Sequence, residues 1–94
     1  MIRSFGDADT EHIFRRTIVR RYSVELQRAA LRKILHVHAA AKLEDLKVPP
    51  GNRLEKLKGK DSDKYSIRVN DQWRIRFSWR EGNAYEVCLI DYHK

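Results

Sequence analysis

The sequence predicts an α+β domain in which two helices pack on one face of a mainly antiparallel, twisted sheet of four to five strands. Three observations predict this class. Residues 7–42 carry helix signals, a Pro-Pro-Gly-Asn run at 49–52 interrupts regular structure, and residues 65–92 alternate between bulky apolar and polar side chains. At 94 residues, the chain is expected to form a single domain over residues 1–94.

The first half of the chain predicts a short strand over residues 2–5 and two helices. Asp7 is among the candidate caps of a helix that ends near Thr17, and Ser23 is a candidate cap of a longer helix that ends near Lys42. The apolar stripe expected on the longer helix is Val24, Leu31, Ile34, Leu35, His38 and Ala41.

The second half predicts a short strand within residues 53–60, a loop at 61–63, and three strands joined by hairpin turns at 70–72 and 81–83. Because side chains alternate between the two faces of a strand, one parity forms the core. The expected core residues of the three strands are Tyr65, Ile67, Val69, Trp73, Ile75, Phe77, Trp79, Tyr85, Val87 and Leu89.

The opposite parity places basic side chains and a tyrosine on the face away from the helices. These residues are Lys58, Arg68, Arg74, Arg76 and Tyr92, with Lys58 included if Leu57 points inward. A face of this kind is suited to binding an anion such as phosphate, because a guanidinium group matches its oxygens.

The strand register sharpens this expectation, since apolar residues must pair with apolar residues across the sheet. A three-residue turn at 70–72 sets Arg68 opposite Arg74 and leaves Tyr92 diagonal to Arg74. Two opposed guanidinium groups need negative charge nearby. That charge comes either from neighbouring acids, with Glu86 on the same parity, or from a bound phosphate.

Composition restricts the function without defining it. The net charge of +7 and the pI near 9.9 favour nucleic acid, an anionic membrane surface or an acidic protein as the partner. The single cysteine, Cys88, excludes an internal disulfide, and no zinc-like Cys/His spacing is present. No apolar run approaches the roughly 20 residues of a membrane span, and no signal peptide is apparent, so a cytoplasmic protein is expected.

Three short segments then match a known pattern: Leu57-Lys58-Gly59, Trp73-Arg74-Ile75 and Asp91-Tyr92-His93. With these in this order, the chain resembles the HigB toxins of the RelE/ParE superfamily, the toxic halves of bacterial type II toxin–antitoxin modules. The likeness covers nearly the whole length, from Met1-Ile2-Arg3-Ser4-Phe5 to the terminal tripeptide.

The resemblance implies an endoribonuclease that cuts messenger RNA in the ribosomal decoding site without a metal or other cofactor. In such enzymes the ribose 2′-hydroxyl attacks the adjacent phosphorus and the 5′-oxygen leaves. The implied partners are the ribosome, the message and a HigA-type antitoxin that also binds operator DNA, with no membrane involved.

The resemblance also assigns roles to residues of the motifs. Lys58 and Arg74 match the positions that stabilise charge on the phosphate, Tyr92 is assigned to proton transfer or base stacking, and His93 to acid–base work. The full set of expected catalytic residues is Lys58, Arg74, Tyr92, His93, Asp91 and Glu55. The expected RNA-binding residues are Arg68, Arg76, Lys56 and Lys60.

Glu55 is a departure from the family pattern. Related toxins often carry histidine three residues before the lysine, as in His-Pro-Leu-Lys-Gly, whereas this chain has Glu55-Lys56-Leu57-Lys58-Gly59. Two interpretations stay open: the carboxylate serves as a base, or it is a surface group paired with Lys56 or Lys58.

Two other functions are compatible with the sequence. ParE-like relatives with the same fold inhibit DNA gyrase and cleave no RNA. A non-catalytic nucleic-acid or ribosome-binding factor would need only the positive charge, and its binding would weaken steeply with salt. The nuclease hypothesis predicts that alanine at Arg74 or Tyr92 abolishes growth arrest while the fold and antitoxin binding remain.

Overall fold

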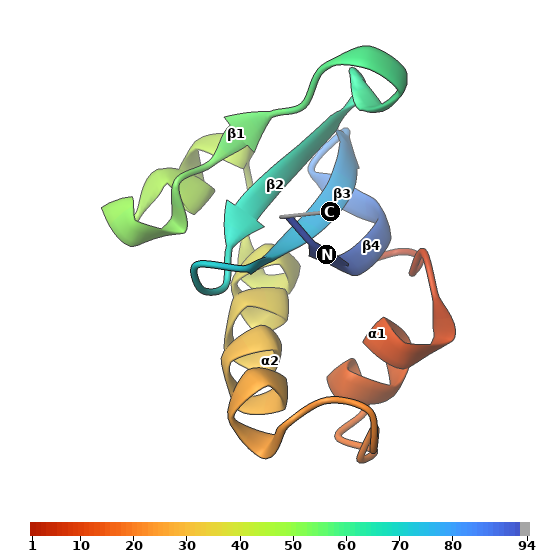
Figure 1. The fold of residues 1–94 in the computed structure, drawn as a ribbon. Helices are drawn as coiled ribbons and strands as arrows, with labels where there is room; N and C mark the ends of the chain where they lie inside the picture. Colours follow the sequence, from red (N-terminus) through yellow and green to blue (C-terminus); the bar gives the residue numbers. More distant parts are fainter. Residues whose placement is uncertain (93–94) are drawn as a thin grey trace.

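The computed structural model describes residues 1–92, and in it two helices pack against a four-stranded antiparallel sheet (Figure 1). This arrangement confirms the predicted fold class. The elements are α1 (Ala8–Phe14), α2 (Val24–Ala39), the 3-10 helices η1 (Leu43–Lys47), η2 (Pro50–Asn52) and η3 (Gly59–Asp61), and the strands β1 (Glu55–Lys56), β2 (Lys64–Arg68), β3 (Trp73–Arg80) and β4 (Asn83–Asp91). The strands follow one another in the order β1-β2-β3-β4.

Both predicted helix caps are confirmed. The Asp7 side chain accepts a hydrogen bond from the Thr10 amide at 2.8 Å, and the Ser23 hydroxyl accepts one from the Leu26 amide at 3.0 Å. Each cap supplies a partner for one of the amides that a helix start leaves unpaired. Both helices end about three residues earlier than expected, α1 at Phe14 and α2 at Ala39.

The apolar stripe predicted for α2 is largely wrong. The residues that the helix buries are Leu26, Ala30, Ile34 and Val37. Of the predicted stripe only Ile34 is fully buried, while Val24 is 61% exposed. The helix carries apolar residues on two overlapping stripes, and packing selects the one centred on Ala30, whose small side chain allows close approach to the sheet.

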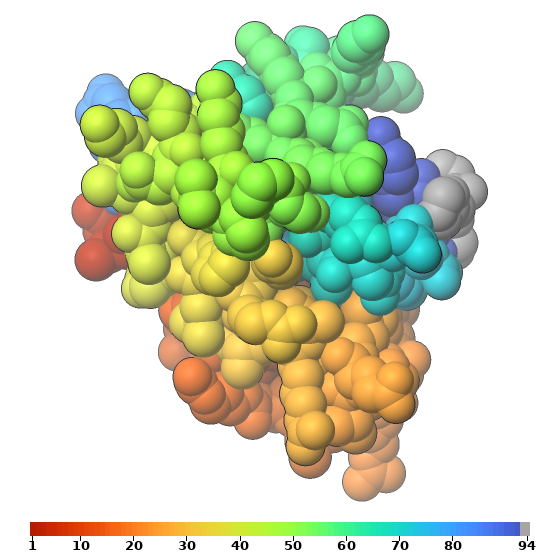
Figure 2. Space-filling view, turned by 90° about the vertical axis from the view of Figure 1, so that its left-hand side faces the viewer, coloured from red at the N-terminus to blue at the C-terminus, as the bar shows by residue number. Residues whose placement is uncertain are grey.

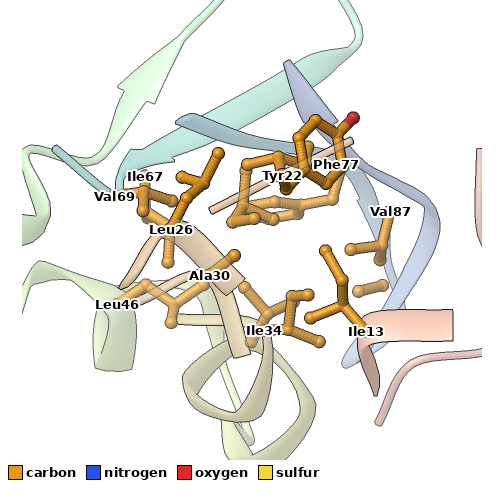
Figure 3. Packing of buried hydrophobic residues seen from close by; sticks show 14 of the residues in the cluster. Ile13, Tyr22, Leu26, Ala30, Ile34, Leu46, Ile67, Val69, Phe77 and Val87 are labelled. Carbon is orange, nitrogen blue, oxygen red and sulfur yellow. The ribbon is translucent and has the colours of Figure 1, made fainter. Parts of the chain in front are cut away.

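The inward parity of the strands is confirmed at most positions. Ile67, Val69, Ile75, Phe77, Val87 and Leu89 are buried, and Tyr65, Trp73 and Trp79 pack at the margin of the same cluster. Ile34 of α2 and Ile13 of α1 contribute to this cluster from the helical side, as Figure 3 shows. The parity argument therefore correctly identifies the sheet half of the core.

The register of the strands is confirmed where it concerns the arginines. Ile67 pairs with Ile75, Arg68 with Arg74, and Ile75 with Leu89.

The β3–β4 turn differs from the expected three-residue form. Glu81 and Gly82, with φ of 49° and 79°, form a two-residue turn, and a register shift between Arg76 and Ser78 restores the predicted pairing beyond it. Positive φ at both central residues is typical of tight hairpin turns.

The prediction that Tyr85 belongs to the core is wrong because of this register shift. Glu86 adopts φ of 54°, a conformation found at the extra residue of a β-bulge. Because of this extra residue, the β4 side chains before Glu86 point to the opposite face from the one that the alternation predicted. Ala84, with no exposed surface, occupies the inward position instead. Tyr85 turns outward, where the Arg80 guanidinium lies 4.1 Å from its ring centroid.

The N-terminal segment lies along the outer edge of β4. The expected strand over residues 2–5 appears as two isolated parallel bridges, from Ile2 to Ala84 and from Phe5 to Val87. The Ile2 amide also donates to Nδ1 of His38 at 3.1 Å, which ties this segment to α2. The edge of β4 is therefore covered by the start of the chain.

Residues 1–92 contain neither a membrane-spanning helix nor a cluster of metal ligands. Neither helix in this range has the length and apolar content needed to cross a bilayer. Within the same residues, no three His, Cys, Asp or Glu side chains gather as a metal site requires.

Candidate functional site

Arg74 is the centre of the candidate site. Its side chain is on the sheet face away from the helices, yet the residue is only 4% exposed. Its Nε donates to the Ser66 hydroxyl at 2.7 Å, and Nη2 donates to the carbonyl oxygens of Ser66 and Arg53. Nη1 lies 3.3 Å from Oε1 of Glu55. The guanidinium group is therefore held in one orientation by β2, by the turn after η2 and by β1.

Glu55 and Tyr92 complete a closed set of contacts around Arg74. The Tyr92 hydroxyl donates to Oε2 of Glu55 at 3.2 Å, and the Arg74 guanidinium carbon lies 5.2 Å from the Tyr92 ring centroid. A cation over an aromatic face is attracted by the quadrupole of the ring, whose face is electron-rich. One carboxylate, one guanidinium and one phenol thus contact one another pairwise.

The electrostatics of Arg74 reflect its burial. Desolvation lowers the pKa of Arg74, and the neighbouring Glu55 and Tyr92 act in the opposite direction. An arginine in a protein remains protonated at any working pH, so the site keeps a fixed positive charge. That charge is desolvated, which makes its interaction with an incoming anion stronger than it would be in water.

The turn after η2 contributes the part of the site that the sequence did not predict. Arg53 adopts the left-handed conformation with φ of 45°, and its carbonyl points to Arg74. Behind it, the fully buried Asn52 side chain donates to the Leu46 carbonyl at 3.2 Å and accepts from the Lys33 ammonium. The only signal in the sequence was the Pro-Gly-Asn run, which predicted a turn and not its role.

Arg74, Glu55, Tyr92 and Arg53 line a cleft of about 510 Å³. Within the described residues, its lining is Gly51, Arg53, Glu55, Arg68, Asn70, Asp71, Arg74 and Tyr92. Three arginines face two carboxylates there. In Figure 2 the green segment around β1 borders the cyan segment of β2 and β3, with the blue end of β4 beside them.

Of the two sources of negative charge that the sequence left open for the arginines, the structure shows neighbouring acids. Arg68 forms an ion pair with Asp71, Arg74 with Glu55, and Arg76 with Asp61 at 3.4 Å. Glu86, the acid suspected from parity, pairs with Lys64 instead at 3.3 Å. The opposed guanidinium groups are thus neutralised by acids from neighbouring turns and from β1, which alternation along the strands could not identify.

The structure brings only some of the predicted site residues together. Glu55, Arg68, Arg74 and Tyr92 line the cleft. The exposed lysines Lys56, Lys58 and Lys60 lie on the segment of β1 and η3 and are not among the lining residues. Asp91 accepts a hydrogen bond from the Gln72 side chain at 3.0 Å, also outside the lining. His93 lies outside the described residues.

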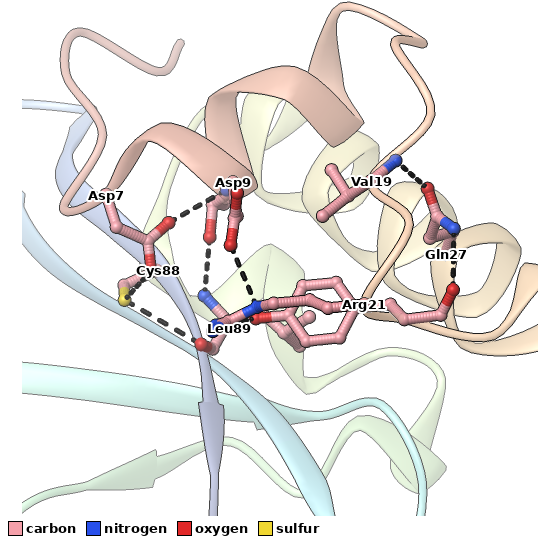
Figure 4. A network of polar contacts seen from close by, with 9 residues as sticks. Asp7, Asp9, Val19, Arg21, Gln27, Cys88 and Leu89 are labelled. Atoms are coloured by element: carbon pink, nitrogen blue, oxygen red, sulfur yellow. Dashed lines mark hydrogen bonds and ion pairs between the residues drawn. The ribbon is translucent and has the colours of Figure 1, made fainter.

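Cys88 is a buried cysteine on the same sheet face, and its surroundings make it unreactive. Its thiol donates to Oδ2 of Asp7 at 3.2 Å, next to the α1 cap (Figure 4). Burial, together with the Asp7 carboxylate, raises the pKa of Cys88 from its usual 9.0 to about 11. A thiol that stays protonated is a poor nucleophile.

This environment predicts a specific loss of stability in alkali. The unfolded chain releases the thiol proton at lower pH than the folded chain, so the contribution of Cys88 is complete below about pH 9 and is lost as the pH rises toward 11. The expected loss is about 2–3 kcal/mol. Urea unfolding of the wild type and of Cys88→Ala across this range measures it. A parallel decline in both proteins would contradict the assignment.

The fold and the site together define a class: a small basic α+β domain with a buried arginine, a glutamate and a tyrosine clustered on the sheet face opposite its helices. The family model for the RelE-like toxin of type II toxin–antitoxin system HigB matches residues 3–93. The chain therefore belongs to the HigB-like toxin family, and a toxin of such a system has an antitoxin partner.

Two relatives are similar to this chain, and the first carries the name of the family. Toxin HigB-1 of Vibrio cholerae serotype O1 is 44% identical over 69 residues, which cover 73% of this chain and 72% of the relative. An uncharacterised protein of Haemophilus influenzae is 37% identical over 68 residues, which cover 72% of this chain and 66% of that protein. The resemblance drawn from the sequence motifs is confirmed at the level of the family.

Proposed function

We propose that this toxin is a ribosome-dependent endoribonuclease that cleaves messenger RNA, with its active site in the cleft around Arg74. The observation that carries the proposal is the fixed, desolvated guanidinium of Arg74, in contact with both a carboxylate and a phenol. Positive charge that is held in place and shielded from water is what stabilises charge that develops on a phosphate.

In the proposed reaction, the 2′-hydroxyl oxygen attacks the adjacent phosphorus and the bond from phosphorus to the 5′-oxygen breaks. The products are a 2′,3′-cyclic phosphate and a 5′-hydroxyl end. Glu55 accepts the 2′ proton, directly or through the Tyr92 hydroxyl that it bonds, and Arg74 stabilises the phosphorane oxygens. His93 donates a proton to the leaving oxygen, an assignment that rests on the sequence motif alone.

The remaining basic residues are proposed to hold the RNA backbone. The ion pairs of Arg68 with Asp71 and of Arg76 with Asp61 are partly exposed, and such pairs contribute about 0–1 kcal/mol each. A phosphate can therefore displace the carboxylates at little cost. Lys56, Lys58 and Lys60 extend this surface beyond the cleft, and the proposed location is the cytoplasm, where ribosomes are.

One observation favours a second candidate, a non-catalytic ribosome- or RNA-binding factor. Each arginine predicted for the open face already has a carboxylate partner, and Lys58 does not line the cleft. A binding factor would require neither a free arginine nor a positioned base. Inhibition of DNA gyrase, as by ParE-like relatives, would need no catalytic residues in the cleft.

The three functions are separated by one experiment. The protein is added to ribosomes translating a defined message, and the 5′ ends of the RNA are mapped and their chemical form is determined. Discrete cuts with 5′-hydroxyl ends are expected. Intact message with salt-sensitive ribosome binding would establish the binding factor, and trapped cleaved DNA in a gyrase assay would establish the gyrase inhibitor.

A further inference from the structure

A small apolar groove lies between the end of α1 and the start of α2. It has a volume of about 200 Å³, and its walls include Ile13, Ile18, Val24 and Leu31, with Arg16 and Arg28 also lining it. In Figure 1 the α1–α2 connection is at the lower end of the molecule, whereas β1 is at the upper end. The groove is therefore on a different part of the surface from the Arg74 cleft.

Two of the apolar side chains in this groove face water. Ile18 is 79% exposed and Val24 is 61% exposed. Large apolar groups that gather on a surface beside polar residues are typical of sites that bind another protein. Nucleic acid is a poorer match: the two arginines could contact phosphates, but the exposed side chains of Ile18 and Val24 offer neither a phosphate nor a base edge a hydrogen bond.

The groove has a fixed shape. The side chain of Gln27 on α2 accepts from the Val19 amide at 2.8 Å and donates to the Tyr22 carbonyl at 3.0 Å, which fastens the connecting loop to the helix. Arg21 is paired with Asp9 of α1 at 2.9 Å. Figure 4 shows this ion pair and the hydrogen bond between Val19 and Gln27. A loop that is already ordered loses little further freedom when a partner binds.

Arg16 occupies a backbone position that glycine normally takes. It has φ of 62° directly after α1, and the Thr17 amide bonds back to the His12 carbonyl at 2.8 Å, the pattern that ends many helices. A residue with a side chain is strained there. Arg16 is nevertheless one of the residues that line the groove.

The charges around the groove are uncompensated. Within residues 1–92, Arg15 is paired with Glu11 and Arg21 with Asp9, whereas Arg16 and Arg28 form no ion pair with an acid. A binding partner with carboxylates next to an apolar side chain would complement both features at once.

We propose that this groove docks an acidic, amphipathic segment of the antitoxin that the family assignment implies. One apolar side chain of that segment inserts between Ile18 and Val24, and flanking carboxylates pair with Arg16 and Arg28. A partner bound there leaves the Arg74 cleft uncovered. The proposal concerns binding alone and holds whether or not the chain cleaves RNA.

The first test replaces an exposed groove residue by aspartate. The probe is the purified cognate antitoxin, and its affinity for the toxin is measured by calorimetry without RNA. Val24→Asp is expected to weaken binding by about 30-fold or more, as loss of a central apolar contact does. Val48→Asp is the matched control, because Val48 is 72% exposed and lies outside the groove. The affinity of the Val48→Asp variant for the antitoxin is expected to stay within about twofold of the wild-type affinity.

The second test uses the strained arginine. Arg16→Gly is expected to raise the melting temperature, because it relieves the left-handed strain, and at the same time to weaken antitoxin binding by about tenfold. Arg28→Glu should weaken binding further, while Arg32→Glu, one turn along α2 and outside the lining, should not. Opposite changes in stability and affinity distinguish a docking residue from a structural one.

Unchanged antitoxin affinity in Val24→Asp and Arg28→Glu would overturn the proposal. The same variants are assayed for co-sedimentation with ribosomes and for self-association by analytical ultracentrifugation. A loss confined to either of those assays would assign the groove to the ribosome or to a second copy of the chain, and would equally show the proposal to be wrong.

Discussion

Arg74→Lys is expected to lower the rate of message cleavage by about 10²–10³-fold, the usual effect of losing one group that stabilises transition-state charge. Lysine retains the positive charge but not the planar fork that bonds Ser66, Arg53 and Glu55 at the same time. The measurement is the rate at which the mapped 5′ ends appear on translating ribosomes. Arg15→Lys is the matched control, because Arg15 is an exposed arginine that is ion-paired with Glu11 and does not line the cleft.

Lysine is a better probe of Arg74 than alanine. The sequence alone predicts that Arg74→Ala leaves the fold intact, but the buried guanidinium joins β1, β2 and the η2 turn. Removing the guanidinium leaves the Ser66 and Arg53 carbonyls without this donor, and a buried acceptor that loses its donor costs about 1–3 kcal/mol, a large share of the stability of a small domain. Urea unfolding should therefore accompany the activity assay. Cleavage by a folded Arg74→Lys variant within about threefold of the wild type would contradict a requirement for the guanidinium fork.

Tyr92→Phe is expected to reduce cleavage by about 100-fold or more, the lower end of what a group active in proton transfer contributes. Phenylalanine keeps the ring beside the Arg74 guanidinium and removes only the hydroxyl that bonds Glu55. Because Tyr92 is 45% exposed, the free energy of unfolding should change by less than about 0.5 kcal/mol.

A matched control exists on the same sheet. Tyr85 lies against Arg80 as Tyr92 lies against Arg74, so Tyr85→Phe removes a hydroxyl from a similar cation–aromatic pair away from the cleft. It should cleave at the wild-type rate. Full activity of Tyr92→Phe combined with inactivity of Tyr92→Ala would contradict proton transfer through the hydroxyl and would leave base stacking as the role of the ring.

The sheet was predictable from the sequence because alternation is a property of the strand backbone itself. Once apolar residues pair with apolar residues, Arg68 must lie opposite Arg74, and the structure confirms that register. The bulge at Glu86 was not predictable, since a single residue with positive φ interrupts no pattern of composition. Tyr85 was misplaced for that reason alone.

The neutralising acids around the arginines were not predictable for a different reason. Glu55 reaches Arg74 from β1, and Asp61 reaches Arg76 from η3, so each pair depends on how a loop folds back over the sheet. The Arg53 carbonyl likewise enters the site through a left-handed turn that only the three-dimensional structure defines. Family resemblance could name Arg74, Tyr92 and the Glu55 position, but it could not show that Glu55 pairs with Arg74 or that the Arg53 carbonyl accepts from Arg74.

The placement of residues 2–5 along β4 has a consequence for solubility. A nine-residue strand with a bare edge can recruit strands from other molecules and seed aggregates. Here the bridges from Ile2 and Phe5 cover that edge at Ala84 and Val87, and the opposite edge of the sheet is β1, which is only two residues long and contains Lys56. Neither border of the sheet offers a long template, so the protein is expected to remain dispersed at high concentration rather than to form fibres.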